Sequence, residues 1–306
     1  MKYIIETESL TKIYGQTPAA ENISLHVPKG KIYGLLGRNG AGKTTVMRML
    51  LNLIRPNKGT ILLFGEDYRS HSDRIYRRIG SIIETPGFYE NLTGCENLQL
   101  IARLRGRHGK DTVKNALEIV GLGKEADKTF SNYSLGMKQR LGIAASIMHE
   151  PELLILDEPI NGLDPIGIHE IRNFLLELSH EKGTTILISS HVLSEIEQLA
   201  DIIGVMHEGH LVEETEMAEL HKCSRQYVEF ETSDVNKAAV LLKQQFNVAD
   251  YTVIDDRVIR IYDCVHDRGT INKSFVENGL MVTKVNVSEE KLEDYFSKLI
   301  GGGGIG

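Results

Sequence analysis

Short apolar runs separated by longer amphipathic stretches make up the chain as far as residue 215. Runs such as IYGLL at 32–36 and LLIL at 153–156 are apolar almost throughout, which is typical of strands buried on both faces of a sheet. Between such runs, apolar residues recur at spacings of three and four, which favours helices. The strands predicted from this pattern are 23–27, Ile32–Leu36, 61–64, 77–84, 153–156 and 185–189, and the predicted helices are 46–54, 98–104 and 113–120.

The alternation of strands and helices predicts an α/β fold with a mostly parallel sheet. The helices expected at 98–104 and 113–120 follow one another without a strand between them, so they indicate an insertion. We therefore expect a domain at 1–215 that carries a helical subdomain at about 86–150.

The segment 216–306 differs in character from the part before it. The polar stretch EETEMAELHKC at 213–223 predicts a link between two domains. Beyond it, YVEFET, YTVI, VIRIYD and LMVTKVNV predict strands, and two helices are expected at 238–246 and 271–277. This order predicts a small α+β domain. The last residues, GGGGIG, are expected to form a flexible tail.

Composition and charge narrow the classes of function. The 35 basic and 42 acidic side chains give a net charge of -7, whose field repels a phosphate backbone, so we expect no nucleic-acid partner. The three cysteines, Cys95, Cys223 and Cys264, match neither a disulfide framework nor a CxxC site, which indicates a reducing compartment. No run of about 18 apolar residues predicts a membrane span, and the N-terminus lacks the pattern of an export signal.

The segment GRNGAGKT at 37–44 matches the pattern GxxxxGK[ST] between a predicted strand and a predicted helix. Its glycines allow backbone N–H groups to face one anion, and the start of a helix favours negative charge. Lys43 is expected to reach the β- and γ-phosphates of ATP, and the Thr44 hydroxyl to bind Mg²⁺. The alternative is a glycine-rich turn with an incidental lysine. The expected nucleotide-binding residues here are Gly37, Arg38, Asn39, Gly40, Ala41, Gly42, Lys43, Thr44 and Thr45.

Two carboxylates, Asp157 and Glu158, end the apolar run of LLILDEP. Ligands of open α/β sheets bind at the carboxyl ends of the strands. Asp157 is expected to hold Mg²⁺ opposite Thr44, and Glu158 to polarise a water in line with the γ-phosphate. A charge pair at a helix start is the alternative. Together with Lys43, the two acids predict an enzyme that hydrolyses ATP.

These motifs, with KIYG, YSLGMKQR and NGLDP, resemble those of the ATP-binding subunits of ABC (ATP-binding cassette) transporters, in that family's usual order. The resemblance implies a P-loop NTPase fold. It implies that Tyr14 stacks on adenine, with packing at a strand end as the alternative. It also implies that Ser134 and Gly136 cap the γ-phosphate of ATP bound by a second subunit. Leu135 and Met137 depart from the glycine and glutamine that the family has there.

The resemblance assigns roles to three further residues. Asp164 in NGLDP is expected to cross a dimer interface. His191 is expected to contact the γ-phosphate and to hold Glu158 and its water in place. Glu84 stands where the family usually has a glutamine that links Mg²⁺ and water to the transmembrane partner. A carboxylate at this position is expected to contact the metal and to alter that coupling.

The resemblance also implies an assembly. Two copies would pack head to tail around two ATP molecules, and their closure would do work on a separate transmembrane permease at the cytoplasmic face of the membrane. With Glu84 at this position, the chain resembles ABC subunits for export of, or immunity to, peptide antibiotics such as lantibiotics and bacitracin. The alternatives are a soluble ABC ATPase acting in translation or DNA maintenance, and a regulator that binds ATP without hydrolysing it. The single cassette, the absence of heptads and the acidic balance argue against the soluble ATPase.

Overall fold

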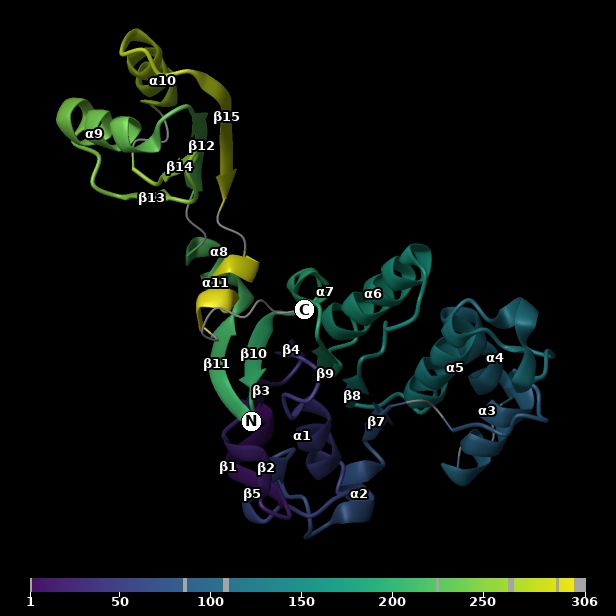
Figure 1. Cartoon of the computed structure of the whole chain (residues 1–306). Coiled ribbons are helices and arrows are strands. Elements are labelled where there is room, and N and C mark those ends of the chain that lie inside the picture. The colour runs from purple at the N-terminus through teal and green to yellow at the C-terminus, as the bar shows by residue number, and fades with distance from the viewer. Residues whose placement is uncertain are drawn as a thin grey trace. The chain divides into compact units, whose positions relative to one another are not determined.

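The computed structural model describes residues 2–84, 87–106, 110–223, 226–263, 267–289 and 292–299 (Figure 1). The chain divides into two compact units, one that ends at Met217 and one that begins at Ala218. Each unit has its own hydrophobic core, so each is described by itself. The predicted tail at 301–306 lies outside the described residues.

A six-stranded sheet with the order β11-β10-β4-β9-β8-β7 is the centre of the first unit. All neighbours in it run parallel except β11, which is antiparallel to β10. The predicted α/β fold with a mostly parallel sheet is thus confirmed, and β4, β8 and β9 are buried at every residue. The strands are β4 (Ile32–Leu36), β7 (Ile79–Ile82), β8 (Leu153–Asp157), β9 (Thr185–Ser190), β10 (Ile202–His207) and β11 (His210–Glu216).

The parallel arrangement brings the carboxyl ends of β4, β8 and β9 to the same edge of the sheet. Asp157, the last residue of β8, lies opposite Ser189 of β9. Glu158 follows β8, His191 follows β9, and the glycine-rich segment at 37–44 follows β4. Residues that are far apart in the sequence therefore meet at one edge.

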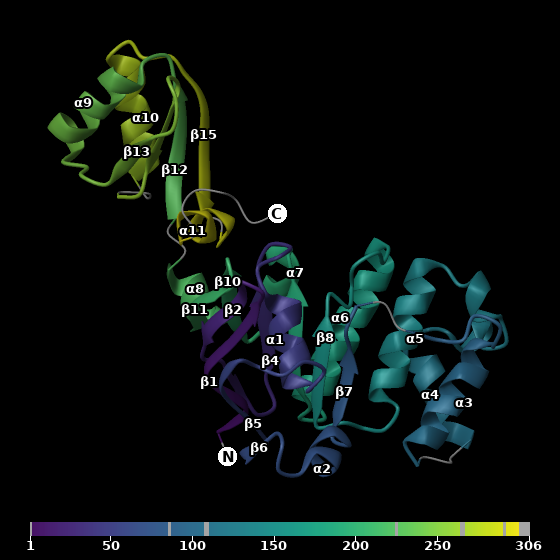
Figure 2. The same cartoon turned by 60° about the horizontal axis from the view of Figure 1, so that its bottom comes forward.

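Helices cover both faces of this sheet (Figure 2). On one face Gly34 lies against α7 (Leu193–Glu197), where an added Cβ would come within 2.4 Å of Ile196 Cγ2. On the other face Leu35 shares a core with Val46 of α1 (Lys43–Leu50). The long helix α6 (Pro165–His180) packs beside β9. The sheet is buried from both sides, which explains its continuous apolar runs.

A second, antiparallel sheet completes the core of the first unit. Its first strand, β1, was not predicted from the sequence. The predicted strand at 23–27 is wrong, because the Thr7 hydroxyl donates to Ile23 O at 3.0 Å and accepts from Leu25 N at 2.8 Å, which separates two strands. The strands are β1 (Tyr3–Tyr14), β2 (Thr17–Ile23), β3 (His26–Pro28), β5 (Lys58–Leu63) and β6 (Glu66–Asp67).

The predicted helical insertion is present after β7. Thr93 starts its first helix with a capping box, in which its hydroxyl accepts from Glu96 N and the Glu96 carboxylate accepts from Thr93 N. Three helices of the insertion pack on one another. They are α3 (Gly94–Leu104), α4 (Lys110–Ile119) and α5 (Leu135–Ile147), with short 3₁₀ turns at Gly123–Glu125 and Phe130–Asn132; the short helix α2 (Ser72–Tyr76) precedes β7.

The division between the two units falls inside the polar link predicted at 213–223, but the segment consists of a strand and a helix. Its first residues belong to β11, and Met217–Cys223 forms α8. β11 is an edge strand, so its ladder bonds are made by the backbone while its polar side chains suit an exposed position. The Glu214 carboxylate also accepts a hydrogen bond from the buried Tyr33 hydroxyl at 2.7 Å. Burial, together with this negative carboxylate, raises the pKa of Tyr33, so its hydroxyl keeps its proton.

The second unit is an α+β fold, as the sequence predicts. Its elements follow in the order β-α-β-β-α-β, and its sheet has the order β13-β14-β12-β15, which is the split βαβ or ferredoxin-like arrangement. Phe230 and Phe275 meet edge to face in its core. The elements are β12 (Gln226–Thr232), α9 (Val235–Phe246), β13 (Tyr251–Val253), β14 (Val258–Ile261), α10 (Arg268–Glu277) and β15 (Val282–Glu289), followed by α11 (Leu292–Leu299). None of the helices in the described residues is long and apolar enough to cross a membrane.

Candidate nucleotide-binding site

The loop between β4 and α1 can only be built with glycine at two positions. Gly42 has φ +101°, and a Cβ there would lie 2.4 Å from Ala19 O. A Cβ on Gly37 would lie 2.5 Å from Met206 O. The tight path leaves α1 without a side-chain cap at Gly42, so its first N–H groups are available to a ligand.

A cavity of about 210 Å³ lies against this loop. The predicted loop residues from Arg38 to Thr45 line this cavity, together with Ala19 and Glu158. Helix-start amides and the buried ammonium of Lys43 give it a positive character. The cavity is thus suited to an anion such as a phosphate chain.

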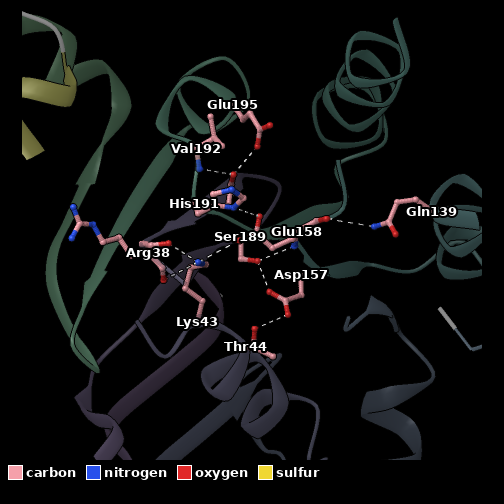
Figure 3. Close-up of polar contacts among 12 residues, drawn as sticks. Arg38, Lys43, Thr44, Gln139, Asp157, Glu158, Ser189, His191, Val192 and Glu195 are labelled. Atoms are coloured by element: carbon pink, nitrogen blue, oxygen red, sulfur yellow. Dashed lines mark hydrogen bonds and ion pairs between the residues drawn. The ribbon is translucent and has the colours of Figure 1, made fainter. Parts of the chain in front are cut away.

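The Lys43 ammonium is fixed at the cavity by backbone carbonyls of the loop (Figure 3). It donates to Gly37 O and, at 3.3 Å, to Arg38 O. It also lies 3.3 Å from Glu158 Oε1. The side chain is only 5% exposed, so these oxygens compensate for the loss of water around its charge. Phosphate oxygens entering the cavity can take the place of the loop carbonyls.

Thr44 and Asp157 converge as the sequence analysis expects. The Thr44 hydroxyl donates to Asp157 Oδ2 at 2.7 Å, and Asp157 is 5% exposed at the end of β8. A hydroxyl and a carboxylate next to a phosphate cavity are oxygen ligands of the kind that Mg²⁺ prefers, with water and phosphate completing its shell. These two residues therefore fit a magnesium ion.

The Glu158 carboxylate lies between Lys43 and His191 at the end of β8. The Glu158 backbone has φ +48°, in the left-handed region, which directs the side chain toward Lys43 and His191. Oε2 lies 2.9 Å from His191 Nδ1. Oε1 is buried, and within the described residues it accepts no hydrogen bond, although Lys43 Nζ is near. Oε1 thus has the Lys43 ammonium as its charge partner and still lacks a well-aligned hydrogen-bond donor, so a ligand or water is expected there.

Two residues that the sequence analysis did not single out hold this edge together. Ser189 Oγ donates to Asp157 Oδ1 at 2.5 Å and accepts from Glu158 N at 2.9 Å (Figure 3). Gln139, buried in α5, donates to Glu158 O at 3.5 Å. Ser189 lies next to last in β9 and two residues before the motif position His191, which was the available signal. Gln139 gave none apart from its place in YSLGMKQR.

Tyr14 lies apart from the cavity wall. It ends β1, is 48% exposed, and has Lys12 Nζ at 5.1 Å from its ring centre. The same hairpin contributes Ala19 to the cavity. An exposed aromatic ring on this hairpin is compatible with adenine stacking, which stays a prediction.

Ser134 and Asp164 both begin helices. Ser134 Oγ accepts from Met137 N at the start of α5, and Asp164 Oδ1 accepts from Gly167 N at the start of α6, each at 3.2 Å. The two helix starts adjoin, because a Cβ on Gly136 would lie 3.2 Å from Leu163 Cδ2. Neither residue lines the cavity of its own chain.

Glu84 is placed with Arg48 rather than with Asp157. Its carboxylate forms an ion pair with the Arg48 guanidinium, its side chain is 62% exposed, and its φ is +59°. Arg48 lies one turn after Thr44 in α1. Glu84 therefore contacts the last turn of this helix, and its contact with a metal stays a prediction.

The chain is similar to known proteins over its whole length. The profile of a family described as "ABC transporter" matches residues 20–161. The chain is 66% identical to the "Bacitracin transport ATP-binding protein BcrA" of Enterococcus faecalis over 100% of this chain and 99% of that protein. It is 55% identical to the protein of the same name in Bacillus licheniformis, over 100% of both.

A third relative matches a part of this chain. This "Lantibiotic transport ATP-binding protein SrtF" of Streptococcus pyogenes is 45% identical over 70% of this chain and 91% of that protein. Among solved structures, "Structure of ATP binding subunit of ABC transporter" is 29% identical with a TM-score of 0.65, and covers 72% of this chain and 92% of that chain.

Proposed function

Because the chain belongs to the ABC transporter family as an ATP-binding subunit, we propose that it hydrolyses ATP to drive export of, or immunity to, a peptide antibiotic through a separate transmembrane permease. The observation that carries the hydrolytic part is the Glu158 carboxylate. One of its oxygens contacts His191, and the other is buried 3.3 Å from Lys43 Nζ and accepts no hydrogen bond in the described part of the chain.

The loop residues bind the phosphates in this proposal. Lys43 exchanges Gly37 O and Arg38 O for β- and γ-phosphate oxygens, while the first N–H groups of α1 bind the same anion. Thr44 and Asp157 hold Mg²⁺ through oxygen. When bound, the ion neutralises the charge that develops on the phosphates.

Glu158 and His191 act on the attacking water. Glu158 Oε1 accepts a hydrogen bond from that water and orients it toward the γ-phosphate. His191, fixed to Glu158 Oε2, keeps the carboxylate in this direction. Which ring nitrogen of His191 carries the proton is decided by this bond, since Nδ1–H is the donor that a carboxylate requires.

The rest of the site comes from a second copy in this proposal. Ser134, Gly136 and Asp164 lie outside the cavity of their own chain, beside two large apolar side chains that are exposed, Leu135 at 60% and Ile166 at 68%. Apolar groups next to polar helix starts suit an interface that also contacts an anion. Two copies packed head to tail would bring each such surface onto the other copy's ATP.

The transported molecule and the partner follow from the relatives. Two relatives matched over nearly their full lengths are named as bacitracin transport proteins, and a third, matched over 70% of this chain, as a lantibiotic transport protein. We therefore propose a peptide antibiotic as the substrate and a membrane permease as the partner, with the chain at the cytoplasmic face, where ATP is available. A soluble ATPase of translation or DNA maintenance is not favoured, because these relatives are transport subunits.

The experiment is peptide resistance in sensitive bacteria that express this chain together with its permease. Lys43→Ala removes the buried ammonium from the phosphate cavity, so resistance should fall to the level of cells without the chain. Lys114→Ala, which changes an exposed lysine on α4, should keep full resistance. The permease should co-purify with both variants. Resistance that survives Lys43→Ala, or a chain that never co-purifies with a membrane protein, contradicts the proposal.

A further inference from the structure

Ser189 is the most completely enclosed polar group at the nucleotide edge of the sheet. Its residue is 0% exposed, and it is the next-to-last residue of β9, directly opposite Asp157 of β8. Its hydroxyl makes two hydrogen bonds, as donor to Asp157 Oδ1 at 2.5 Å and as acceptor from Glu158 N at 2.9 Å. One hydroxyl thus contacts both acidic residues of the site (Figure 3).

For Asp157, the bond to Ser189 gives the two carboxylate oxygens different partners. Oδ1 is taken by Ser189, and Oδ2 faces Thr44 at 2.7 Å. A carboxylate bonded at both ends cannot rotate freely about its terminal bond. The oxygen offered at the Thr44 side is therefore always the same one, in the direction a metal ion next to Thr44 would need.

For Glu158, the bond supports an unusual backbone. Its φ of +48° lies in the left-handed region, which is strained for a residue with a Cβ. In this conformation the N–H turns to Ser189 Oγ, and the carbonyl accepts from Asn161 N at 3.2 Å. Without the hydroxyl, a partly buried N–H would lose its acceptor, and the left-handed conformation would lose a fixed point. The direction of the Glu158 side chain toward Lys43 and His191 depends on that backbone conformation.

We propose that Ser189 is a positioning residue for ATP hydrolysis, which sets the metal-side oxygen of Asp157 and the backbone of Glu158 with one hydroxyl. This inference rests on the proposed function, since it assumes that Asp157 and Glu158 serve magnesium and water. Ser189 itself touches neither ATP nor water in this scheme. Its effect is on the direction of two acids and not on the affinity of the loop for phosphate.

The test compares Ser189→Ala, Ser189→Cys and Ser189→Thr in the full-length chain. Loss of the hydroxyl should lower kcat for ATP about 10- to 100-fold, as for other residues that orient a metal ligand or base. KM for ATP should change little, because Lys43 and the loop amides are intact. ATP affinity in EDTA should equal that of the wild type, while the gain in affinity on adding Mg²⁺ should shrink. Cysteine fills the space without an effective donor and should behave like alanine, whereas threonine should restore most of kcat.

The matched control is Thr185→Val on the same strand. Thr185 is also 0% exposed, and its hydroxyl also accepts from a backbone N–H, that of Gly30, at 2.9 Å, but at the opposite end of β9. This variant should lose thermal stability as Ser189→Ala does and keep kcat and the magnesium effect. Equal losses of kcat in the two variants would reduce Ser189 to a structural role.

The outcomes separate this inference from the proposed function. Wild-type protein that hydrolyses ATP, beside alanine and cysteine variants with unchanged kcat and unchanged magnesium effect, overturns the role of Ser189 alone. Wild-type protein without magnesium-dependent hydrolysis overturns the proposed function, and the role of Ser189 with it. If Ser189→Ala fails to fold, the cysteine variant decides, since it keeps the volume of the side chain.

Discussion

The two polar surfaces of the first unit, the phosphate loop with the β8 end and the starts of α5 and α6, differ in how far the chain completes them. At the loop, Lys43 and Asp157 are buried and bonded to partners from other elements. At the helix starts, the side chains of Ser134 and Asp164 each bond, among the described residues, to a backbone N–H three residues on, next to exposed Leu135. At the phosphate loop the side chains are already held in place by other parts of the same chain. At the helix starts the side chains only cap their own helices.

The difference teaches where rigidity is required. Groups that direct a metal and a water must be oriented before the substrate arrives, so the chain fixes them through its own sheet. Groups that close over a ligand from another molecule must stay accessible, so they use local caps that need no tertiary partner. The contrast predicts that variants at the loop change chemistry within one chain, while variants at the helix starts act through the pair.

The largest effect is expected at the phosphate loop and the end of β8. Glu158→Gln keeps the size of the side chain and removes the negative charge that polarises water, so kcat for ATP should fall about 10²- to 10⁴-fold. ATP should still bind and should accumulate in a dimer, because the loop and the helix starts are unchanged. Single-turnover ATPase measurements and size-exclusion chromatography with Mg²⁺ and ATP check both points. Hydrolysis at the wild-type rate would show that Glu158 is not the base.

A smaller effect is expected at the helix starts. Ser134→Ala removes a cap and a donor to the second copy's phosphate, so multiple-turnover ATPase should fall about tenfold while ATP affinity of the single chain stays as it was. Both can be followed by titration calorimetry and steady-state kinetics.

Asp234→Ala is the matched control for that variant. Asp234 caps α9 of the second unit in the same way, accepting from Lys237 N at 3.0 Å. Both variants should lose about 1 kcal/mol of unfolding free energy in the unit concerned. Only Ser134→Ala should affect hydrolysis, and a similar loss in Asp234→Ala would mean that capping alone explains the result.

The smallest effect is expected at Glu84, outside both surfaces. Glu84→Gln breaks the ion pair with Arg48, which is exposed and worth less than about 1 kcal/mol, so stability should hardly change. ATP binding should be preserved, and turnover or peptide resistance should shift by a few-fold, if the charge acts on the metal or on the coupling to the permease. Unchanged ATPase rate together with unchanged resistance would remove any special role for this carboxylate.

The phosphate loop and the buried strands of the core sheet were predictable because their signals are local. A strand buried on both faces must be apolar throughout, and the loop must have glycine where Gly37 and Gly42 approach Met206 and Ala19. Lys43, Thr44 and Asp157 follow from these patterns by position alone. The capping box that starts α3 at Thr93 is also a local signal, but the helix was predicted only at 98–104 because apolar spacing alone was used there.

β1 and β11 were not predictable in the same way. β11 is rich in glutamate and reads as a polar link, yet it pairs with β10 at the edge of the sheet, where backbone bonds and not apolar side chains hold it. The break between β2 and β3 depends on Thr7, which is 16 residues away from Ile23 in the sequence. Pairing of this kind has no local signature.

By itself, then, the sequence determined which residues we expect to carry the chemistry, since phosphate and magnesium require particular groups at particular spacings along one loop and one strand end. Tertiary structure alone decided how those groups are aimed. The Ser189 hydroxyl, the left-handed turn of Glu158 and its contact with His191 arise because β8 and β9 lie side by side in parallel register. Hydrogen bonds between strands depend on distance and direction in space, and residues some 30 positions apart acquire these only when the sheet has formed.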